Sequence, residues 1–210
     1  MKQNNTNKTF KTELEKLKQM SIEDRLWYIW EYYKGVFAGI IIACVIISIG
    51  VQMFQNSQLK SLLSIAVVDS NYNHDEQVEA LQNDFLAYAG TGDKHEVVDV
   101  DTSLLSGDDY NAVVKMTVVM GAGTADMMFC GEETYKKYKQ QEAFLSWKEV
   151  LGDDYSKYEE YMTDDGRLDL EKCPNWEKYN MVYYSPVYAV VMSSSKNLEN
   201  CIKFLEMMVQ

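Results

Sequence analysis

The chain has 210 residues, a formal net charge of −12 and a hydrophobic fraction of 47%. The acidic excess falls after residue 54, because seven of the 20 Lys and Arg residues but only five of the 32 acidic residues precede residue 35. An acidic domain of this kind repels nucleic acid and anionic lipid, so nucleic acid is excluded as a partner. Two prolines and eleven glycines also exclude a collagen-like or low-complexity chain.

Residues 1–34 are predicted to form a cytoplasmic arm. The first nine residues are polar and expected to be disordered, and apolar residues at helical spacing from Phe10 to Met20 predict an amphipathic helix. Ser21 and Asp24 form a Ser-x-x-acid pattern, which predicts a second helix starting at Ile22. The arm ends in aromatic and cationic residues that favour the membrane interface: Trp27, Tyr28, Trp30, Tyr32, Tyr33 and Lys34.

Residues 35–54 carry no charge and, at about 1.5 Å per residue, are long enough to cross a hydrocarbon core of ~30 Å. Seven Lys and Arg residues precede this run, whereas Lys60 is the only one in the twenty residues that follow it. This asymmetry predicts a single-pass anchor in the cell membrane, with a cytoplasmic N-terminus and an extracytoplasmic C-terminal domain. The alternatives are a cleaved signal peptide, whose apolar core is normally shorter, and a buried core helix. Gly35 and Gly39 leave open dimerisation of the span, although small residues are also simply tolerated there.

The remainder is predicted to be a tether, residues 55–61, followed by one domain, residues 62–210. Apolar runs predict strands at residues 62–68, 96–100 and 125–129. Helical periodicity and turn residues predict intervening helices at residues 74–89, at residues 108–120 and from residue 131 onward. This alternation predicts a three-layer α/β domain with a mainly parallel sheet and right-handed crossovers.

The pattern is looser after Trp147. A short helix is expected at residues 153–161, a short strand at residues 167–170, and a β-prone segment at residues 182–192 that Pro186 bends or confines to an edge. Residues 198–209 are predicted to form an amphipathic helix with Asn197 as its cap. Free buried thiols are favoured over one disulfide for the three cysteines outside the span: Cys130, Cys173 and Cys201.

Three short segments carry a resemblance to a known family. They are Gly123-Thr-Ala-Asp126 with the apolar run behind it, Ala143-Phe-Leu-Ser-Trp147, and the Ser-Lys-Asn segment that leads into the last helix at residues 193–205. Their order resembles that of extracellular solute-binding proteins with a periplasmic-binding-protein-like type 2 fold. The resemblance covers most of residues 62–205 and implies non-enzymatic binding of a solute. Solute-binding proteins have two lobes, whereas this domain has the length of one lobe and a rudimentary second.

Asp99 and Asp101 have the spacing of the Asp-x-Asp nucleophile loop of haloacid-dehalogenase-like phosphatases. That loop needs a nucleophilic carboxylate at a strand end, a second acid and Mg²⁺. Ser103 occupies the position of the usual threonine, and no later acidic motif supplies the metal ligands. The interpretation favoured here is that the two aspartates cap a short strand and begin a loop.

No other motif predicts catalysis, a metal or a cofactor. Residues 163–169 suggest a calcium loop, but aligning Gly166 places Tyr161 and Lys172 where oxygen ligands are required, so a turn is predicted. His74 and His95 have no partner at metal-ligand spacing, and residues 193–195 lack the surroundings of a catalytic serine. The protein is therefore predicted not to be an enzyme.

Ligand-binding residues are predicted from topology, because ligands of parallel α/β sheets lie beyond the carboxyl ends of the strands. The residues that follow the first and third strands, or return opposite them, are Asp69, Ser70, Tyr72, Cys130, Gly131, Glu132, Tyr184 and Ser185. Asp126 is instead expected to hold the turn before its strand. The sequence thus predicts a membrane-anchored binding or sensing module for a small molecule or partner protein. The alternatives are an accessory or assembly subunit of a membrane complex, and a hydrolase with an unrecognised site.

Overall fold

The computed structural model describes residues 21–210, which belong to two compact units divided after Gln58. The predicted disordered segment and the amphipathic helix expected from Phe10 lie outside the described residues. Each unit is described by itself below.

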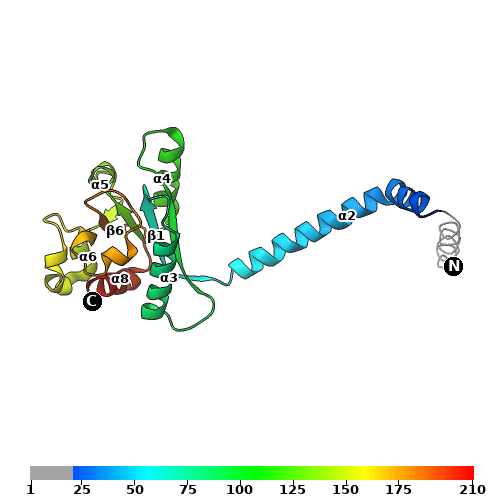
Figure 1. Cartoon of the computed structure of the whole chain (residues 1–210). Helices are drawn as coiled ribbons and strands as arrows, with labels where there is room; N and C mark the ends of the chain where they lie inside the picture. Colours follow the sequence, from blue (N-terminus) through cyan, green and yellow to red (C-terminus); the bar gives the residue numbers. More distant parts are fainter. Residues whose placement is uncertain (1–20) are drawn as a thin grey trace. The chain divides into compact units, whose positions relative to one another are not determined.

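The first unit is the helix α2 (Ile22–Asn56), which is continuous over its whole length (Figure 1). The Ser21 hydroxyl accepts a hydrogen bond from the Asp24 amide at 3.2 Å, which confirms the predicted start of this helix. The stretch Lys34–Gln55 has a mean hydropathy of 2.5 with none of it buried, so it is long and apolar enough to cross a membrane. Because α2 ends at Asn56 and the next strand begins at Lys60, the connection is shorter than the predicted tether.

The second unit is built on one six-stranded sheet with the order β2-β1-β3-β6-β4, and β5 also pairs with β6. The strands are β1 (Lys60–Val68), β2 (Glu96–Leu104), β3 (Met127–Cys130), β4 (Phe144–Leu145), β5 (Leu168–Asp169) and β6 (Tyr188–Met192). β1 pairs in parallel with β2 and β3, as predicted from the β-α-β-α-β pattern. β6 is antiparallel to its three neighbours, with Met128 opposite Val190, so the sheet is mixed.

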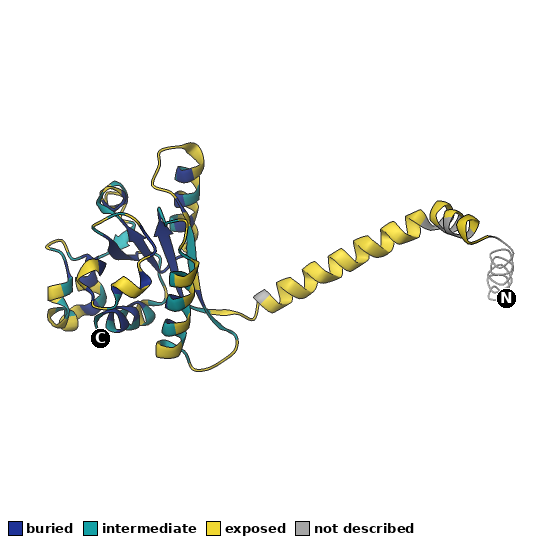
Figure 2. Ribbon diagram, in the orientation of Figure 1, coloured by how far each residue is buried: buried dark blue, intermediate teal, exposed yellow. Residues whose placement is uncertain are grey.

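Helices cover both faces of this sheet, which confirms an α/β architecture with three layers (Figure 1). The α-helices are α3 (Asp75–Ala89), α4 (Tyr110–Ala122), α5 (Glu132–Lys139), α6 (Trp147–Leu151), α7 (Trp176–Tyr179) and α8 (Leu198–Val209). On one face Leu63 and Phe129 of the strands pack with Phe85 of α3 and Phe204 of α8. On the other face the sheet packs against α4 and α5, with Met116 fully buried. Figure 2 shows this buried interior around the strands.

The helix boundaries near the sheet follow from local capping residues. Asp109 accepts hydrogen bonds from the Asn111 and Ala112 amides at the start of α4, and Gly123 ends that helix with a left-handed φ of 62°. Gly90 ends α3, where its amide bonds to the Leu86 carbonyl. These caps lie where the sequence predicted them. Gly123 adopts its positive φ without strain, and Asp109 satisfies unpaired amides, whereas Gly90 ends α3 in an extended conformation.

Several predicted elements differ from the structure. β2 runs on to Leu104 rather than ending at residue 100, because its later residues continue to pair with β1. The helix expected at residues 153–161 consists of two 3₁₀ segments, η1 (Gly152–Lys157) and η2 (Glu159–Tyr161). The strand expected at residues 167–170 is reduced to β5, and the 3₁₀ segment η3 (Leu170–Lys172) follows it. Within the β-prone segment, residues before Tyr188 form the bend that Pro186 predicted, and one strand follows.

Candidate functional site

A cavity of about 330 Å³ lies at the carboxyl ends of β1 and β3, and we call it the strand-end cavity. Asp69 follows β1 directly, and Gly131 follows β3 directly. In the sheet, β2 pairs with one edge of β1 and β3 pairs with the other edge, so the connections from β1 to β2 and from β2 to β3 run in opposite directions across the sheet. This is the topological switch point of the sheet, where ligands of α/β proteins usually bind. The position therefore agrees with the site predicted from topology.

Asp69 shapes one wall of the strand-end cavity. It is one of two non-glycine residues with positive φ among those described, and its φ is 52°. Its carboxylate accepts a hydrogen bond from the Ser106 amide at 3.0 Å, and its own amide donates to the Leu104 carbonyl. Aspartate tolerates this left-handed conformation better than most residues, although it still carries strain. The chain thus turns sharply out of β1 and brings a carboxylate to the cavity.

The opposite wall is the start of α5 together with Tyr184. A Cβ atom on Gly131 would lie 3.3 Å from the Tyr184 ring, so the absence of a side chain at Gly131 lets the ring approach the backbone. The Tyr184 hydroxyl is buried and has no hydrogen-bond partner among the described residues. Burial, with Cys130 and Asp69 nearby, raises the pKa of this phenol, so it stays neutral. A polar atom left open in this way is a position where a ligand or water can complete the bonding.

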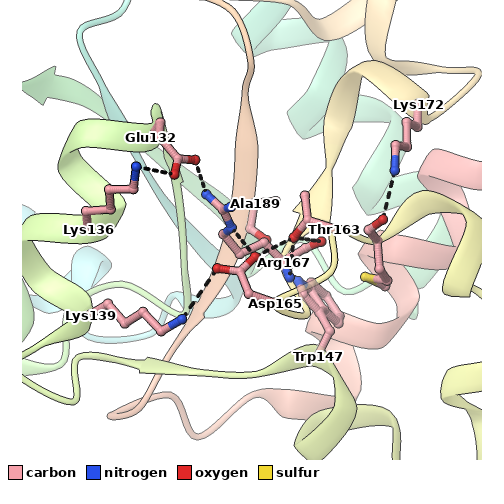
Figure 3. A network of polar contacts seen from close by, with 10 residues as sticks. Glu132, Lys136, Lys139, Trp147, Thr163, Asp165, Arg167, Lys172 and Ala189 are labelled. Carbon is pink, nitrogen blue, oxygen red and sulfur yellow. Dashed lines mark hydrogen bonds and ion pairs between the residues drawn. The ribbon is translucent and has the colours of Figure 1, made fainter.

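A network of ion pairs holds the α5 end of the cavity in place, and Figure 3 shows its centre at Arg167. The Arg167 guanidinium donates to the Glu132 carboxylate and, at 2.7 Å, to Asp165. Lys136 also pairs with Glu132 at 3.0 Å, and Lys139 pairs with Asp165 at 3.4 Å (Figure 3). The hydrogen bond from Arg167 lowers the pKa of Glu132, so this carboxylate is ionised at neutral pH.

Arg167 also stacks between two aromatic rings. Its guanidinium carbon lies 3.9 Å from the centre of the Tyr188 ring and 4.4 Å from that of Tyr135. Because Arg167 is buried, its positive charge is compensated within the domain, by the two carboxylates and by the faces of the two rings. The network positions Glu132 at the cavity. None of its cationic side chains lines the cavity.

Five of the eight residues predicted from topology line the strand-end cavity: Asp69, Gly131, Glu132, Tyr184 and Ser185. Two others lie close by without lining it. Ser70 forms a bridge with Val182 and donates its hydroxyl to the Thr102 carbonyl, while Cys130 is fully buried at the end of β3. Tyr72 does not line the cavity and is fully exposed. The left-handed turn at Asp69 lies between β1 and Tyr72.

The cavity also has lining residues that the sequence did not indicate: Ser106, Glu133, Thr134, Tyr183 and Pro186. Glu133 and Thr134 belong to the first turn of α5, so counting that turn into the site would have found them. Ser106 lies two residues after the end of β2 at Leu104, whereas the sequence placed the end of this strand at residue 100. Tyr183 precedes Tyr184 and has 74% of its surface exposed, with its ring centre 6.2 Å from that of Tyr184.

The acidic pair Asp99 and Asp101 does not form a nucleophile loop. Both residues lie within β2, and the strand continues to Leu104, so the expectation that they cap its end is wrong. Asp101 accepts a hydrogen bond from the Ser103 amide at 2.9 Å and lies 3.9 Å from Lys115. Within residues 21–210, no group of three or more His, Cys, Asp or Glu side chains could hold a metal ion. Both aspartates are therefore part of the strand, and Asp101 also contacts α4 through Lys115.

The remaining predicted features stabilise turns and helix starts rather than line the cavity. Residues 163–167 form a turn in which the Thr163 amide donates to the Arg167 carbonyl and Gly166 has a φ of 79°. Asp126 is buried and accepts hydrogen bonds from the Ser64 amide, the Ser195 hydroxyl and the Asn197 side chain. It therefore holds the turn before β3, as predicted. The amide of Asn197 is used in this contact, so Asn197 precedes α8 without capping it through its side chain.

The cysteines are unpaired. Cys130, Cys173 and Cys201 are buried free thiols, which agrees with the favoured prediction, and burial raises the pKa of each to about 12. Thiols of this kind stay protonated at neutral pH and are poor nucleophiles. Their role is to fill the core.

No protein-family model matches the sequence, and no curated protein matches it significantly.

Proposed function

We propose that this chain is a membrane-anchored binding or sensing module that holds a small molecule in the strand-end cavity without transforming it. The observation that carries the proposal is the place and lining of this cavity. It lies at the switch point of the sheet, and aromatic, hydroxyl and carboxylate side chains from four segments converge on it. Its volume of about 330 Å³ suits a small ligand, because ligand pockets commonly span roughly 300–1,000 Å³.

The proposal includes a placement in the cell. α2 spans the membrane once, the N-terminus is cytoplasmic, and the α/β unit is extracytoplasmic. Support comes from the apolar stretch Lys34–Gln55 and from the excess of cationic residues before it. Protease added to intact cells should remove the α/β unit, whereas the same unit surviving in intact cells but not in lysed cells would overturn this orientation.

The resemblance to one lobe of a solute-binding protein belongs to this proposal as well. All six strands of the described domain join a single sheet, so the chain from residue 59 onward offers one lobe. Residues 59–210 by themselves cannot close on a ligand in the way that two lobes do. Binding by this domain is therefore expected to report a ligand at the membrane surface or to pass it to a partner.

The test is a thermal-shift screen of the full chain in detergent with sugars, amino acids, amines and short peptides. A ligand present at one hundred times its Kd should stabilise the fold by about 2.7 kcal/mol. The Tyr183→Ala variant should lose this shift, because Tyr183 lines the cavity and is exposed. Tyr72→Ala is the matched control, since Tyr72 is also an exposed tyrosine but does not line the cavity. No stabilisation by any class of compound would overturn the binding function.

A second candidate function is that of an accessory subunit of a membrane protein complex, and the outer face of α4 favours it. Tyr110, Val114 and Val118 succeed one another at helical spacing and are 81%, 40% and 57% exposed. A helix that is apolar on its outer side is usually covered. A photo-crosslinker at position 118 should then give one discrete product with a membrane protein in intact cells, and should give none when placed at Glu79 of α3.

A further inference from the structure

The charged side chains that line the strand-end cavity are all acidic. Three carboxylates line it, and no Lys or Arg among residues 21–210 does. Glu132 is neutralised by Arg167 and Lys136. Asp69 and Glu133 form no ion pair with any described residue. Two carboxylates at one small cavity therefore lack a counter-ion within this part of the protein.

The start of α5 does not reverse this charge. The unpaired amides of a first helical turn carry a partial positive charge equivalent to about half an elementary charge, which by itself favours an anion. Glu132 and Glu133 both lie in that turn and place two carboxylates beside these amides. The two carboxylates outweigh the partial positive charge of the amides, so this turn disfavours phosphate, sulfate or carboxylate ligands.

Aromatic rings stand beside these carboxylates. Tyr183 and Tyr184 both line the cavity, with ring centres 6.2 Å apart and ring planes at 81° to one another. The electron-rich face of an aromatic ring attracts a cation. The Tyr184 hydroxyl, which is buried and without a partner among the described residues, adds a polar atom next to Gly131.

We propose that the strand-end cavity binds a small organic cation, an alkylammonium or quaternary ammonium compound. Its charge faces Asp69 and Glu133, and its carbon groups pack on Tyr183. This inference rests on the proposed binding function and adds the chemical class of the ligand. A bare metal ion is not its natural occupant, because no cluster of three or more ligating side chains is present in the described chain.

The experiment uses two pairs of probes that differ in charge but little in size, with the full chain in detergent and isothermal titration calorimetry. Choline is compared with 3,3-dimethyl-1-butanol, in which carbon replaces the charged nitrogen. Putrescine is compared with 1,4-butanediol. At least one cation should bind at least about tenfold more tightly than its neutral counterpart. That binding should weaken as salt is raised from about 0.05 M to about 0.5 M, because screening becomes strong over this range.

Two variants locate the binding. Asp69→Asn removes one charge and keeps both the left-handed backbone and the acceptor for Ser106, and it should weaken cation binding about tenfold. Tyr183→Ala should weaken it about two- to thirtyfold. The matched controls Glu79→Gln and Tyr72→Ala remove one charge or one ring elsewhere on the surface, and each should leave the affinity unchanged.

The outcomes separate this inference from the function on which it rests. Equal binding of cations and neutral probes, or binding of neither cation, overturns the organic-cation inference. If the broader screen still yields a ligand whose effect is lost in Tyr183→Ala, the binding function stands with another ligand class. If no compound in either experiment binds, both proposals fall.

Discussion

Replacing Asp69 should separate the effect of backbone conformation from that of charge at the mouth of the strand-end cavity. Asp69 has a φ of 52°, in the left-handed region, and its carboxylate accepts the Ser106 amide at 3.0 Å. Alanine removes the acceptor and disfavours this conformation. Glycine removes the acceptor but accepts the conformation, and asparagine keeps both.

The expected magnitudes follow from these two terms. A left-handed conformation costs an alanine about 1–2 kcal/mol. Loss of the hydrogen bond to Ser106 costs about 0.5 kcal/mol, at the low end of the usual range, because Ser106 is exposed and water can replace the acceptor. Asp69→Ala should therefore lower the free energy of unfolding by about 2 kcal/mol. Asp69→Gly and Asp69→Asn should each stay within about 0.5 kcal/mol of the native protein.

The buried cysteines provide the assay. Cys130, Cys173 and Cys201 are inaccessible in the folded α/β unit, so brief alkylation labels them only after unfolding. The full chain in detergent is titrated with urea, pulsed with a thiol reagent and analysed by mass spectrometry of its peptides. Cys44 lies in α2 and is scored separately, because it reports on the detergent-embedded helix.

The comparison of alanine with glycine decides the matter. If the two variants lose the same free energy, backbone strain at Asp69 contributes nothing, and the reasoning from φ is refuted. If asparagine is as damaging as alanine, the charge of Asp69 stabilises the fold, and its proposed availability to a ligand is refuted as well.

Three further predictions use the same assay. Arg167→Met should destabilise the α/β unit by about 2–3 kcal/mol, because it removes charged hydrogen bonds to carboxylates that remain about one-third exposed; an effect below about 1 kcal/mol would contradict this. Gly123→Ala should lower the free energy of unfolding by about 1–2 kcal/mol, because φ is 62° at this residue and a Cβ atom would lie 3.3 Å from Ser194. The control Gly121→Ala should not destabilise the protein, because a Cβ atom there meets no other atom within 4 Å. The lowered pKa of Glu132 stabilises the fold at pH values above its unfolded value of 4.5, and this contribution is lost as the pH falls from there through the lowered folded pKa. The loss of stability between pH 7 and about pH 3 should therefore be smaller in Arg167→Met than in the native protein, and an unchanged loss would contradict the pairing.

Much of the fold up to α5 could be predicted because its local signals agree with one another. β1 is a compact apolar run, α4 has an aspartate before it and a glycine after it, and these features need no distant partner. The segment between β4 and β6 could not be predicted in the same way. Its short pieces depend on tertiary contacts, such as the hydrogen bond from the Trp147 indole to the Ala189 carbonyl at 2.8 Å.

The candidate site was predicted to the extent that it follows from topology. Strand ends are visible in a sequence, so the order of strands and helices along the chain was enough to place Asp69 and Gly131 beside one another. The Arg167 network could not be predicted, because its partners come from α5 and from a turn far along the chain, and no periodicity links them. The exposure of Tyr72 outside the cavity could not be predicted, because a positive φ at an aspartate leaves no signal in the sequence.

The position of β6 has a consequence for biosynthesis. β3 ends at Cys130, and β6, which pairs along it, begins only at Tyr188. At roughly 5–20 residues per second, translation of the intervening segment takes several seconds, during which an apolar strand edge of the nascent chain is unpaired. Folding of the domain therefore completes only after β6 has emerged. A message truncated before the codon for residue 188 should yield a chain that quality-control proteases remove, rather than a shorter folded domain.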